Sequence, residues 1–333
     1  MNLPTTVGIT GGAGFVGANL TERLLREGCR VIAVDDMSAA SMRNVADFID
    51  NPAYELHKFD CRDVRQLRKT FADVDAIVAL AAKKIPRYGG AVGTLEVNTE
   101  SAHAAYEVGI MLDAHVVFAS TSDVYGNAAP PFNEADPIVL GPSTTRRWAY
   151  AISKLYDEHM AFGLAEDRGL RCTILRLFNS YGPRAHPTWW AGPTSPFIEN
   201  LLDGGMMELH GDGRQVRTFT YVGDTVDGFV RALARPETAG EIINIGGDEP
   251  VSIFKLAQKT QAALDIAGPL RATMKPIERI GGRYQDVRIR IPDVEKAAEL
   301  LGFRASVPLE EGLAHTVAWH RLLRAERDAE AVE

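Results

Sequence analysis

The stretch Thr10-Gly-Gly-Ala-Gly-Phe-Val-Gly17 decides the fold, because it follows a short apolar run and spaces three glycines three residues apart. This pattern lets the chain turn sharply from a strand into a helix, where backbone N–H groups can approach a pyrophosphate. A Cβ at Gly11 or Gly14 would obstruct that approach, and Gly17 lets the helix pack closely on the strand. The spacing therefore predicts a dinucleotide site. Its predicted cofactor-binding residues are Gly11, Gly14, Phe15, Val16 and Gly17.

The next strand-like run ends in an acidic residue that indicates which dinucleotide is bound. Asp35 lies eighteen residues after Gly17, and this spacing places its carboxylate at the adenosine ribose hydroxyls. A carboxylate at that position repels a 2′-phosphate, and the first basic residue after it is Arg43. The pattern therefore predicts NAD rather than NADP as the cofactor.

Three further positions complete the predicted cofactor site. Asp60, at the end of the third strand-like run, is a candidate to accept a hydrogen bond from the adenine amino group. A helix cap is an equally good interpretation for Asp60 or for Asp63. The other two predicted contacts are Cys61 and Leu80.

Strand-like and helix-like segments alternate along the first half of the chain. Such alternation gives parallel strands joined by crossover helices, so it predicts an α/β fold with a Rossmann-type doubly wound parallel sheet. The predicted strands are Val7–Thr10, Arg30–Asp35, Tyr54–Phe59, Ala76–Leu80, Val116–Ala119 and Leu170–Phe178, and the predicted helices are Phe15–Glu27, Val64–Phe71, Leu95–Val108, Val294–Leu301 and Leu309–Arg321.

The alternation loosens near Tyr181, where glycine and proline become dense. We therefore expect an NAD-binding domain over residues 1–180, to which residues 215–248 return. A smaller C-terminal α/β part, over residues 181–214 and 249–325, is expected to bind the substrate. The final dozen residues are charged and rich in alanine, and we expect them to fray.

The composition narrows the class of protein. Of 333 residues, 46% are apolar and 24% charged, and 36 basic against 44 acidic residues give a net charge of −8, which argues against a sequence-independent nucleic-acid binder. Cys29, Cys61 and Cys172 have no paired spacing, which suits a reducing cytoplasm and indicates no metal site. The longest apolar run, Ala76–Ala82, is too short to cross a bilayer, and the N-terminus has no leader pattern. We expect a soluble cytoplasmic protein.

Tyr150 and Lys154 lie four residues apart, in Tyr-Ala-Ile-Ser-Lys, and would share one helix face. An ammonium group near a phenol stabilises the phenolate, which predicts a lowered Tyr150 pKa, suited to a general base. That spacing alone more often marks a surface pair. The dinucleotide pattern and the hydroxyl run Ser120-Thr121-Ser122 favour catalysis instead.

Together these motifs resemble the extended short-chain dehydrogenase/reductases that act on nucleotide sugars, the NAD-dependent epimerase/dehydratase family. The similarity covers nearly the whole chain, including Leu177–Pro183, Arg217–Asp224 and Pro308–Gly312. It implies that hydride passes from carbon 4 of the sugar of a UDP-sugar substrate to NAD.

The resemblance also implies roles for single residues. Thr121 would hydrogen-bond the oxygen on carbon 4, Tyr150 would remove the hydroxyl proton, and Lys154 would hold the nicotinamide ribose. Asn179 and Arg217 match positions that contact the nucleotide diphosphate; a capping asparagine and a solvated arginine are the alternatives from the residues alone.

Two further runs are most similar to UDP-glucuronate decarboxylases. Ser120-Thr-Ser-Asp-Val-Tyr-Gly126 resembles their Ser-Thr-Ser-Glu-Val-Tyr-Gly, and the run 282–293 resembles the surroundings of their essential arginine, which maps to Arg290. The resemblance implies that oxidation at carbon 4 creates a β-keto acid, which loses CO₂ to an enolate stabilised by Thr121 and Tyr150. Return of the hydride would give UDP-xylose, and early release would give the 4-keto pentose.

The chain also departs from that pattern. Asp123 stands where those decarboxylases have glutamate, and a carboxylate displaced by roughly 1 Å can cost on the order of a hundredfold in rate. Tyr88 matches a tyrosine near the sugar carboxylate. Lys83 and Lys84 are less usual, and Lys84 would suit an epimerase-like cofactor contact.

Three other functions stay open at this point. A nucleotide-sugar 4-epimerase would leave Asp123 superfluous, and a 4,6-dehydratase would carry an Asp-Glu pair where this chain has Ser122-Asp123. A non-catalytic NAD-sensing protein commonly lacks the pair Tyr150 and Lys154.

An anionic substrate requires local positive charge against the net charge of −8. The arginines predicted to provide it are Arg184, Arg217, Arg283 and Arg290. The resemblance implies a homodimer that pairs the helix carrying Tyr150 with the helix near 95–108. The predicted catalytic residues are Thr121, Asp123, Tyr150, Lys154 and Arg290, and the predicted substrate contacts are Tyr88, Thr121, Ser122, Asn179, Arg184, Arg217 and Arg290.

Overall fold

The computed structural model describes residues 2–84, 90–189, 192–280 and 285–330. Its centre is a seven-stranded sheet in the order β11-β6-β5-β4-β1-β2-β3, with every neighbouring pair parallel. The predicted doubly wound Rossmann-type fold is confirmed. The strands are β1 (Thr6–Thr10), β2 (Arg30–Asp35), β3 (Tyr54–Lys58), β4 (Ala76–Ala79), β5 (His115–Thr121), β6 (Cys172–Leu177) and β11 (Ile242–Ile245).

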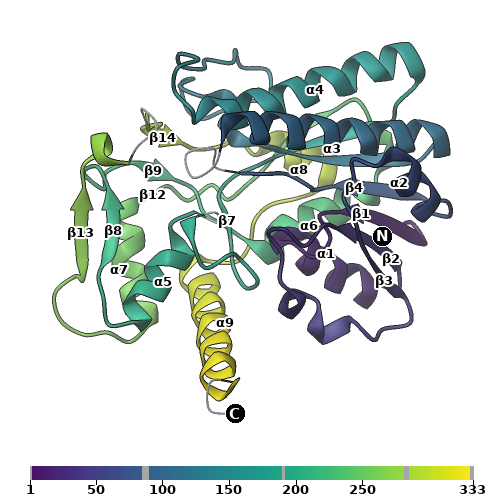
Figure 1. Ribbon diagram of the computed structural model, residues 1–333. Helices are drawn as coiled ribbons and strands as arrows, with labels where there is room; N and C mark the ends of the chain where they lie inside the picture. Colours follow the sequence, from purple (N-terminus) through teal and green to yellow (C-terminus); the bar gives the residue numbers. More distant parts are fainter. Residues whose placement is uncertain (1, 85–89, 190–191, 281–284, 331–333) are drawn as a thin grey trace.

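Helices cover both faces of this sheet (Figure 1). One layer packs on apolar strand side chains such as Ile77, Val116 and Phe118, and the other packs on Val7, Val31 and Ile243. The first layer contains α2 (Val64–Thr70), α3 (Ala91–Leu112) and α4 (Trp148–Arg168), and the second contains α1 (Phe15–Arg26), α6 (Val222–Leu233) and α8 (Glu295–Leu301). Because apolar residues face both layers, the central strands β1, β2 and β4 are buried along almost their whole length, whereas the edge strand β3 carries Glu55, His57 and Lys58.

The strand order reverses between β1 and β4. From β1 the chain adds β2 and β3 on one side, and from β4 it adds β5, β6 and β11 on the other side. In doubly wound sheets, ligands bind beyond the carboxyl ends of the strands at such a reversal. Gly11 follows β1, Thr121 ends β5 and Asn179 follows β6, so the predicted site residues emerge at this edge.

A smaller α/β part lies beside the sheet (Figure 1). Its core is formed by Phe197, Leu256 and Leu313, and a three-stranded sheet β12-β9-β14 and a pair β13-β8 belong to it. Its elements are α5 (Thr194–Leu202), β8 (Met207–His210), β9 (Val216–Arg217), β12 (Val251–Ser252), α7 (Ile253–Ala263), β13 (Ala272–Lys275), β14 (Ile289–Arg290) and α9 (Leu309–Glu330), while β7 (Ser180–Tyr181) pairs with β10 (Thr220–Tyr221) between the two parts.

The chain passes between the two parts of the molecule more often than the predicted domain boundaries imply. After β9, helix α6 packs on α1 and strand β11 pairs with β6. Both elements therefore belong to the part of the molecule that is built on the seven-stranded sheet. Ala297, Leu301 and Phe303 also pack in the core beside α1 and α6. The segment around α8 therefore differs from the expectation that residues 249–325 belong wholly to the substrate-binding part.

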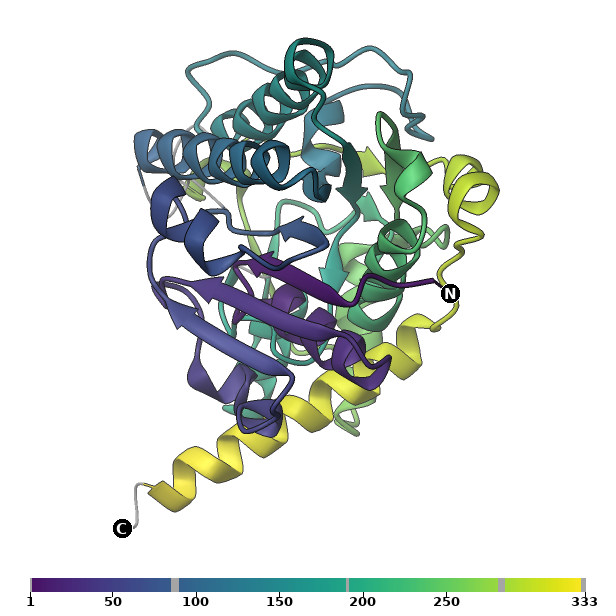
Figure 2. The same cartoon turned by 90° about the vertical axis from the view of Figure 1, so that its right-hand side faces the viewer.

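The C-terminal helix corrects another expectation. The predicted helix ended at Arg321 and the following residues were expected to fray, but α9 continues to Glu330. Ion pairs hold this extension, because Arg324 contacts Asp203 at 2.7 Å and Glu326 accepts from Arg43 at 2.8 Å. Figure 2 shows α9 crossing the lower side of the molecule. Over the described residues, no helix has the length and apolar character that spanning a bilayer requires.

Candidate active site

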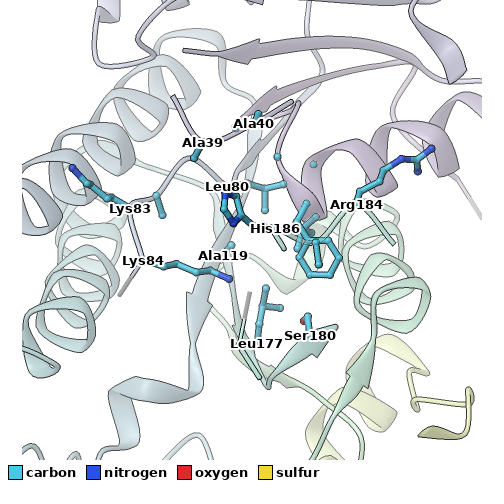
Figure 3. Close-up of a pocket in the computed structure, with 18 of the residues that line it drawn as sticks. Ala39, Ala40, Leu80, Lys83, Lys84, Ala119, Leu177, Ser180, Arg184 and His186 are labelled. Atoms are coloured by element: carbon cyan, nitrogen blue, oxygen red, sulfur yellow. The ribbon is translucent and has the colours of Figure 1, made fainter. Parts of the chain in front are cut away.

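A cavity of about 1120 Å³ lies where the large sheet meets the smaller part. The glycine turn lines one end, and Thr121, Tyr150 and Arg290 line the other. Figure 3 shows strand-end residues such as Leu80 and Ala119 on its floor. Its size and its place at the strand reversal fit a dinucleotide and a second ligand side by side.

The glycine turn is built to exclude side chains. Gly11 has a φ of +72°, and a Cβ there would lie 2.9 Å from the Ala81 nitrogen. A Cβ on Gly17 would lie 2.3 Å from the Gly11 oxygen, so the helix contacts the turn as predicted. Gly14 is the N-cap of α1 and its N–H donates back to the Gly11 oxygen. These positions leave a cradle of backbone N–H groups that a Cβ would fill, which fits a pyrophosphate.

The adenosine end of the cavity carries a fixed carboxylate. Asp35 accepts from the Ala13 nitrogen at 3.1 Å and from the Met37 nitrogen at 2.9 Å. Burial raises the pKa of Asp35, and these backbone bonds oppose the rise. Arg43, the nearest basic residue in sequence, donates to Glu326 and to Asp47. Its charge is therefore matched by two carboxylates, which agrees with the prediction of NAD over NADP.

The two interpretations of Asp60 and Asp63 can now be compared. Asp63 is the N-cap of α2 and accepts from the Gln66 nitrogen at 3.0 Å. Asp60 lines the cavity but its carboxylate is bound by Arg62 at 2.6 Å. Cys61 is buried beside them, and burial raises its pKa to about 11, so it contributes packing rather than a thiolate.

Tyr150 and Lys154 are both buried on the inner face of α4 and line the cavity. The predicted lowering of the Tyr150 pKa is wrong, because burial and the Asp123 charge both raise it above its ordinary value. Burial also lowers the pKa of Lys154 to about 8, against the opposing charge of Asp157. The ammonium lies 4.4 Å from the centroid of the Phe118 ring. The spacing therefore predicted the pair correctly but not the cost of burying its charges.

Thr121 lies next to the phenol of Tyr150. Its hydroxyl is hydrogen-bonded to Tyr150, and it also accepts from the Asp123 nitrogen at 3.2 Å. Thr121 caps the short 3-10 helix Ser122–Tyr125, which fixes the turn after β5. Two hydroxyl groups thus meet at one point of the cavity wall, where they can both contact a single substrate oxygen.

A buried ion pair supports this turn from below. Arg176 on β6 binds Glu158 on α4 at 2.6 Å, and the Ser120 hydroxyl donates to the same carboxylate. The Arg176 guanidinium also lies 4.6 Å from the Tyr125 ring centroid. The cluster ties β5, β6 and α4 together directly beneath Thr121.

Arginines and carboxylates alternate at the Thr121 end of the cavity. Asp123 Oδ1 accepts from Arg147 Nη2 at 2.8 Å and from Arg290 Nη2. Asp286 Oδ1 accepts from Arg147 Nη1 at 3.0 Å and from Arg217 Nη2 at 2.9 Å. Burial alone would raise the pKa of Asp123, but Arg290 and Arg147 outweigh it and hold that pKa well below its ordinary value. Asp123 is therefore held as a carboxylate near neutral pH.

The sequence interpretation assigned no role to Arg147 or Asp286. Arg147 stands three residues before Tyr150, and Asp286 stands four before Arg290, but the two are separated by 139 residues in the chain. No local pattern indicates their contact. The structure also places Ser122 here, 3.4 Å from Arg290 Nη1.

The other predicted substrate residues divide into three cases. Asn179 and Arg217 line the cavity, and the Asn179 amide donates to the Thr218 oxygen at 2.8 Å. Arg184 also lines the cavity, but it is paired with Glu22 and with Asp47 from the NAD-binding part. These two carboxylates match its charge, so Arg184 contributes little spare positive charge. Tyr88 and Arg283 lie outside the described residues.

The residues around the cavity fit NAD as the bound cofactor. Over the part of the chain that the structure describes, no cluster of three or more His, Cys, Asp or Glu side chains could hold a metal ion. The glycine cradle fits the pyrophosphate and Asp35 fits the ribose. Tyr150 and Lys154 stand at the opposite end of the same cavity.

The chain belongs to the NAD dependent epimerase/dehydratase family, which residues 7–246 match. It is therefore an enzyme of this family with NAD as cofactor, and the resemblance seen in its motifs is confirmed. It is 33% identical over 94% of its length to UDP-N-acetyl-alpha-D-glucosaminuronate decarboxylase of Bacillus cytotoxicus, covering 97% of that protein. It is 32% identical over 94% of its length to UDP-glucuronic acid decarboxylase 1 of Xenopus tropicalis, covering 71% of that protein.

The solved structures point to the same family. UDP-glucuronic acid 4-epimerase from Bacillus cereus, in complex with UDP-glucuronic acid and NAD, is similar with a TM-score of 0.85 and 26% identity. The similarity covers 96% of this chain and 99% of that protein. Relatives with different reactions thus share this fold, so the choice among reactions depends on the residues at the Thr121 end of the cavity.

Proposed function

We propose that this protein is an NAD-dependent decarboxylase of a UDP-uronic acid, with UDP-glucuronate as the first candidate substrate. The observation that carries the proposal is the charge at the Thr121 end of the cavity. Three arginines, Arg147, Arg217 and Arg290, face two carboxylates, Asp123 and Asp286. The excess positive charge favours a sugar that brings its own carboxylate.

The side chains support a sequence of steps for that substrate. When bound, NAD accepts a hydride from carbon 4 of the sugar and later returns it. Thr121 donates to the oxygen on carbon 4 while Tyr150 takes the hydroxyl proton. This step requires that the positive charge of bound NAD offset the burial and the Asp123 charge that raise the pKa of Tyr150. The resulting 4-ketone places a carbonyl β to the carboxylate, so the C5–C6 bond breaks and CO₂ leaves. Thr121 and Tyr150 then stabilise the enolate oxygen, where the negative charge develops.

Asp123 has a different role from that of an acid or base. A carboxyl group held ionised by two arginines has no proton to give and binds protons poorly. We propose that Asp123 orients Arg147 and Arg290, so that Arg290 faces the sugar carboxylate. The aspartate then needs to reach only the arginines, which explains why the shorter side chain is tolerated.

The deciding experiment measures whether the sugar loses its carboxyl carbon as CO₂. The protein is incubated with NAD and UDP-glucuronate, and products are identified by mass spectrometry. Release of CO₂ with a pentose nucleotide supports the proposal, whether the pentose is UDP-xylose or the 4-keto form. Formation of UDP-galacturonate alone would establish a 4-epimerase instead. Tyr150→Phe serves as the inactive control.

A second candidate substrate is UDP-N-acetylglucosaminuronate. The relative from Bacillus cytotoxicus carries that substrate in its name and matches 94% of this chain. The two substrates differ only at carbon 2, so they share the chemistry at carbons 4 to 6. Competition between them in one reaction, measured as the ratio of kcat/KM values, identifies the preferred substrate.

We also propose that the protein works as a homodimer in the cytoplasm. Ile152 and Tyr156 lie one turn apart on α4, with 40% and 51% of their surfaces exposed. α3 and α4 lie side by side on one face of the molecule (Figure 1). A second copy docked there would cover these side chains. Light scattering should give a dimer mass for the wild type and a monomer mass for Tyr156→Asp.

The proposed cytoplasmic location is compatible with the cysteines. Cys29, Cys61 and Cys172 are all free thiols, as a reducing compartment allows.

A further inference from the structure

We propose that Lys84 is the catalytic acid that delivers a proton to carbon 5 of the sugar after CO₂ has left. This role rests on the proposed decarboxylation. The enolate left by CO₂ must gain one proton at carbon 5 to become the 4-keto pentose. The groups already assigned at the Thr121 end of the cavity do not supply it.

Each of those groups is excluded by its own environment. Asp123 is held as a carboxylate by Arg147 and Arg290, and a guanidinium group does not give up its proton in proteins. Tyr150 is engaged with Thr121 at the oxygen on carbon 4. Lys154 is 98% buried beneath that pair and packs over the Phe118 ring.

Lys84 reaches the cavity from a different wall. It follows β4, and Figure 3 shows its side chain entering the cavity beside Ala119 with the amine directed inward. Lys83, its neighbour, directs its amine away toward α3 in the same view, where it would lie 3.5 Å from a Cβ on Gly93. Of this lysine pair, Lys84 is therefore the one that faces the substrate.

The ammonium of Lys84 also has no hydrogen-bond or ion-pair partner in the part of the chain that the structure describes. The Asp123 charge attracts it, and the Lys154 charge repels it. Lys84 is exposed within the open cavity. The surrounding protein atoms still desolvate its ammonium and lower its pKa below the ordinary value, against the attraction of Asp123, which makes it a stronger acid than a fully solvated lysine.

The proton transfer balances. The electron pair of the enolate C4–C5 double bond forms a C5–H bond with a proton from Lys84 Nζ, and the oxygen on carbon 4 returns to a carbonyl. Lys84 is left as a neutral amine and regains a proton from water through the open cavity. The net change is one proton taken from solvent for each CO₂ released.

Among the other titratable side chains that line the cavity, His186 is the one drawn near Lys84 in Figure 3. His186 appears beside Leu80 and Ala119 in Figure 3, and burial lowers its pKa. It is therefore largely neutral near pH 7, and its Nδ1 is 2.9 Å from the Thr188 hydroxyl. A neutral imidazole is a much weaker acid than an ammonium group with a lowered pKa.

The test uses the stereochemistry of carbon 5, which becomes a methylene in the pentose. The full-length protein converts UDP-glucuronate with NAD in D₂O, and NMR locates the deuterium in the product. Wild type and the matched control Lys83→Met should place one deuterium at a single position. Lys84→Met should still release CO₂ but form pentose about a hundredfold more slowly, with deuterium at both positions. Lys84→Arg keeps the charge but not the acidity and should also scramble the label.

Four results would overturn the proposal. Retained stereochemistry in Lys84→Met would exclude Lys84 as the donor, and a simultaneous fall in bound NAD would assign it to the cofactor. Full rescue by Lys84→Arg would show that only its charge matters. Loss of CO₂ release in Lys84→Met would place Lys84 before decarboxylation. Absence of CO₂ from wild type would instead refute the proposed function, which is a separate measurement.

Discussion

Arg147 Nη2 donates to Asp123 Oδ1 at 2.8 Å, and through this contact the first turn of α4 is tied to the turn after β5. Both residues face the point where Thr121 meets Tyr150, so the contact helps set the geometry of the reacting end of the cavity. Arg290 binds the same oxygen from the smaller part of the molecule. One carboxylate thus joins three segments.

Asp123→Asn should reduce kcat by about a hundredfold while NAD remains bound. The amide cannot balance two guanidinium groups, so Arg147 and Arg290 shift apart, whereas the glycine turn lies at the other end of the cavity. The measurements are kcat with UDP-glucuronate and NAD content per protomer. Asp123→Glu is the matched control and should recover much of the rate. Equal losses in Asn and Glu variants would contradict a charge-based role.

The pKa of the Asp123 carboxyl group predicts how activity and stability depend on pH. The pKa of Asp123 is lowered in the folded state, so its stabilising charge is fully present above the unfolded value near 4 and is lost only as pH falls through the lower folded value. We therefore expect Asp123 to cause no acid limb in the kcat profile between about pH 5 and about pH 8. The lower bound is roughly one unit above the unfolded pKa of an aspartate. An acid limb in the wild-type kcat profile that vanishes in Asp123→Asn would show otherwise.

Asp157→Asn should move the alkaline limb of kcat to lower pH, by about one unit. Asp157 is buried three residues after Lys154, and its charge supports the ammonium of Lys154, whose pKa burial lowers to about 8. Without that charge, Lys154 loses its proton at a lower pH, and its charged form is the one proposed to hold the ribose. Asp167→Asn, on the exposed end of α4, is the control and should leave the profile unchanged. An unshifted limb in Asp157→Asn would show that Lys154 does not depend on Asp157.

Gly17→Ala should lower the free energy of unfolding by about 3 kcal/mol and abolish NAD binding. The added Cβ would lie 2.3 Å from the Gly11 oxygen and 2.8 Å from the Gly12 Cα, both backbone atoms that cannot move independently of the turn. The measurements are urea unfolding and NAD content after purification.

Gly163→Ala is the matched control for that substitution. Gly163 lies within α4, and a Cβ there would meet nothing within 4 Å. Alanine should therefore raise the free energy of unfolding by about 0.5–1 kcal/mol through helix propensity. If both substitutions destabilised the protein equally, the effect at Gly17 would reflect the loss of glycine rather than the close backbone approach.

The elements that sequence predicts well are those fixed by local pattern. β2 has the predicted ends, and β1, β3 and β4 differ from theirs by one residue. For β1, β2 and β4 the reason is that a strand buried on both faces must be largely apolar along its length. The glycine turn and Asp35 were equally predictable, since each depends on spacing within 30 residues. What failed depends on the third dimension. The pKa of Tyr150 rises through burial, which no spacing of Tyr150 and Lys154 encodes.

The arginines illustrate the same limit. Arg184 and Arg290 look alike as basic residues in substrate-facing segments, but Arg184 meets Glu22 and Asp47 from the first domain. Arg147 and Asp286 meet across 139 residues. Whether an arginine offers free charge depends on partners brought to it by the fold, so charge counted along the chain overestimates what a substrate encounters.

Glu326→Gln should raise the affinity for NADP by up to about fivefold and leave the affinity for NAD unchanged. Arg43 lies at the adenosine end, where Glu326 on α9 binds its Nε at 2.8 Å and Asp47 binds its Nη1 at 3.1 Å. The variant frees part of the Arg43 charge for a 2′-phosphate, and the gain stays small because Asp35 still repels that group. Fluorescence titration of NAD-depleted protein with each cofactor measures both affinities. Arg324→Gln, which breaks the exposed contact of α9 with Asp203, is the control and should not change selectivity. Equal weakening of NAD and NADP binding in Glu326→Gln would mean that α9 only holds the cavity wall in place and does not select the cofactor.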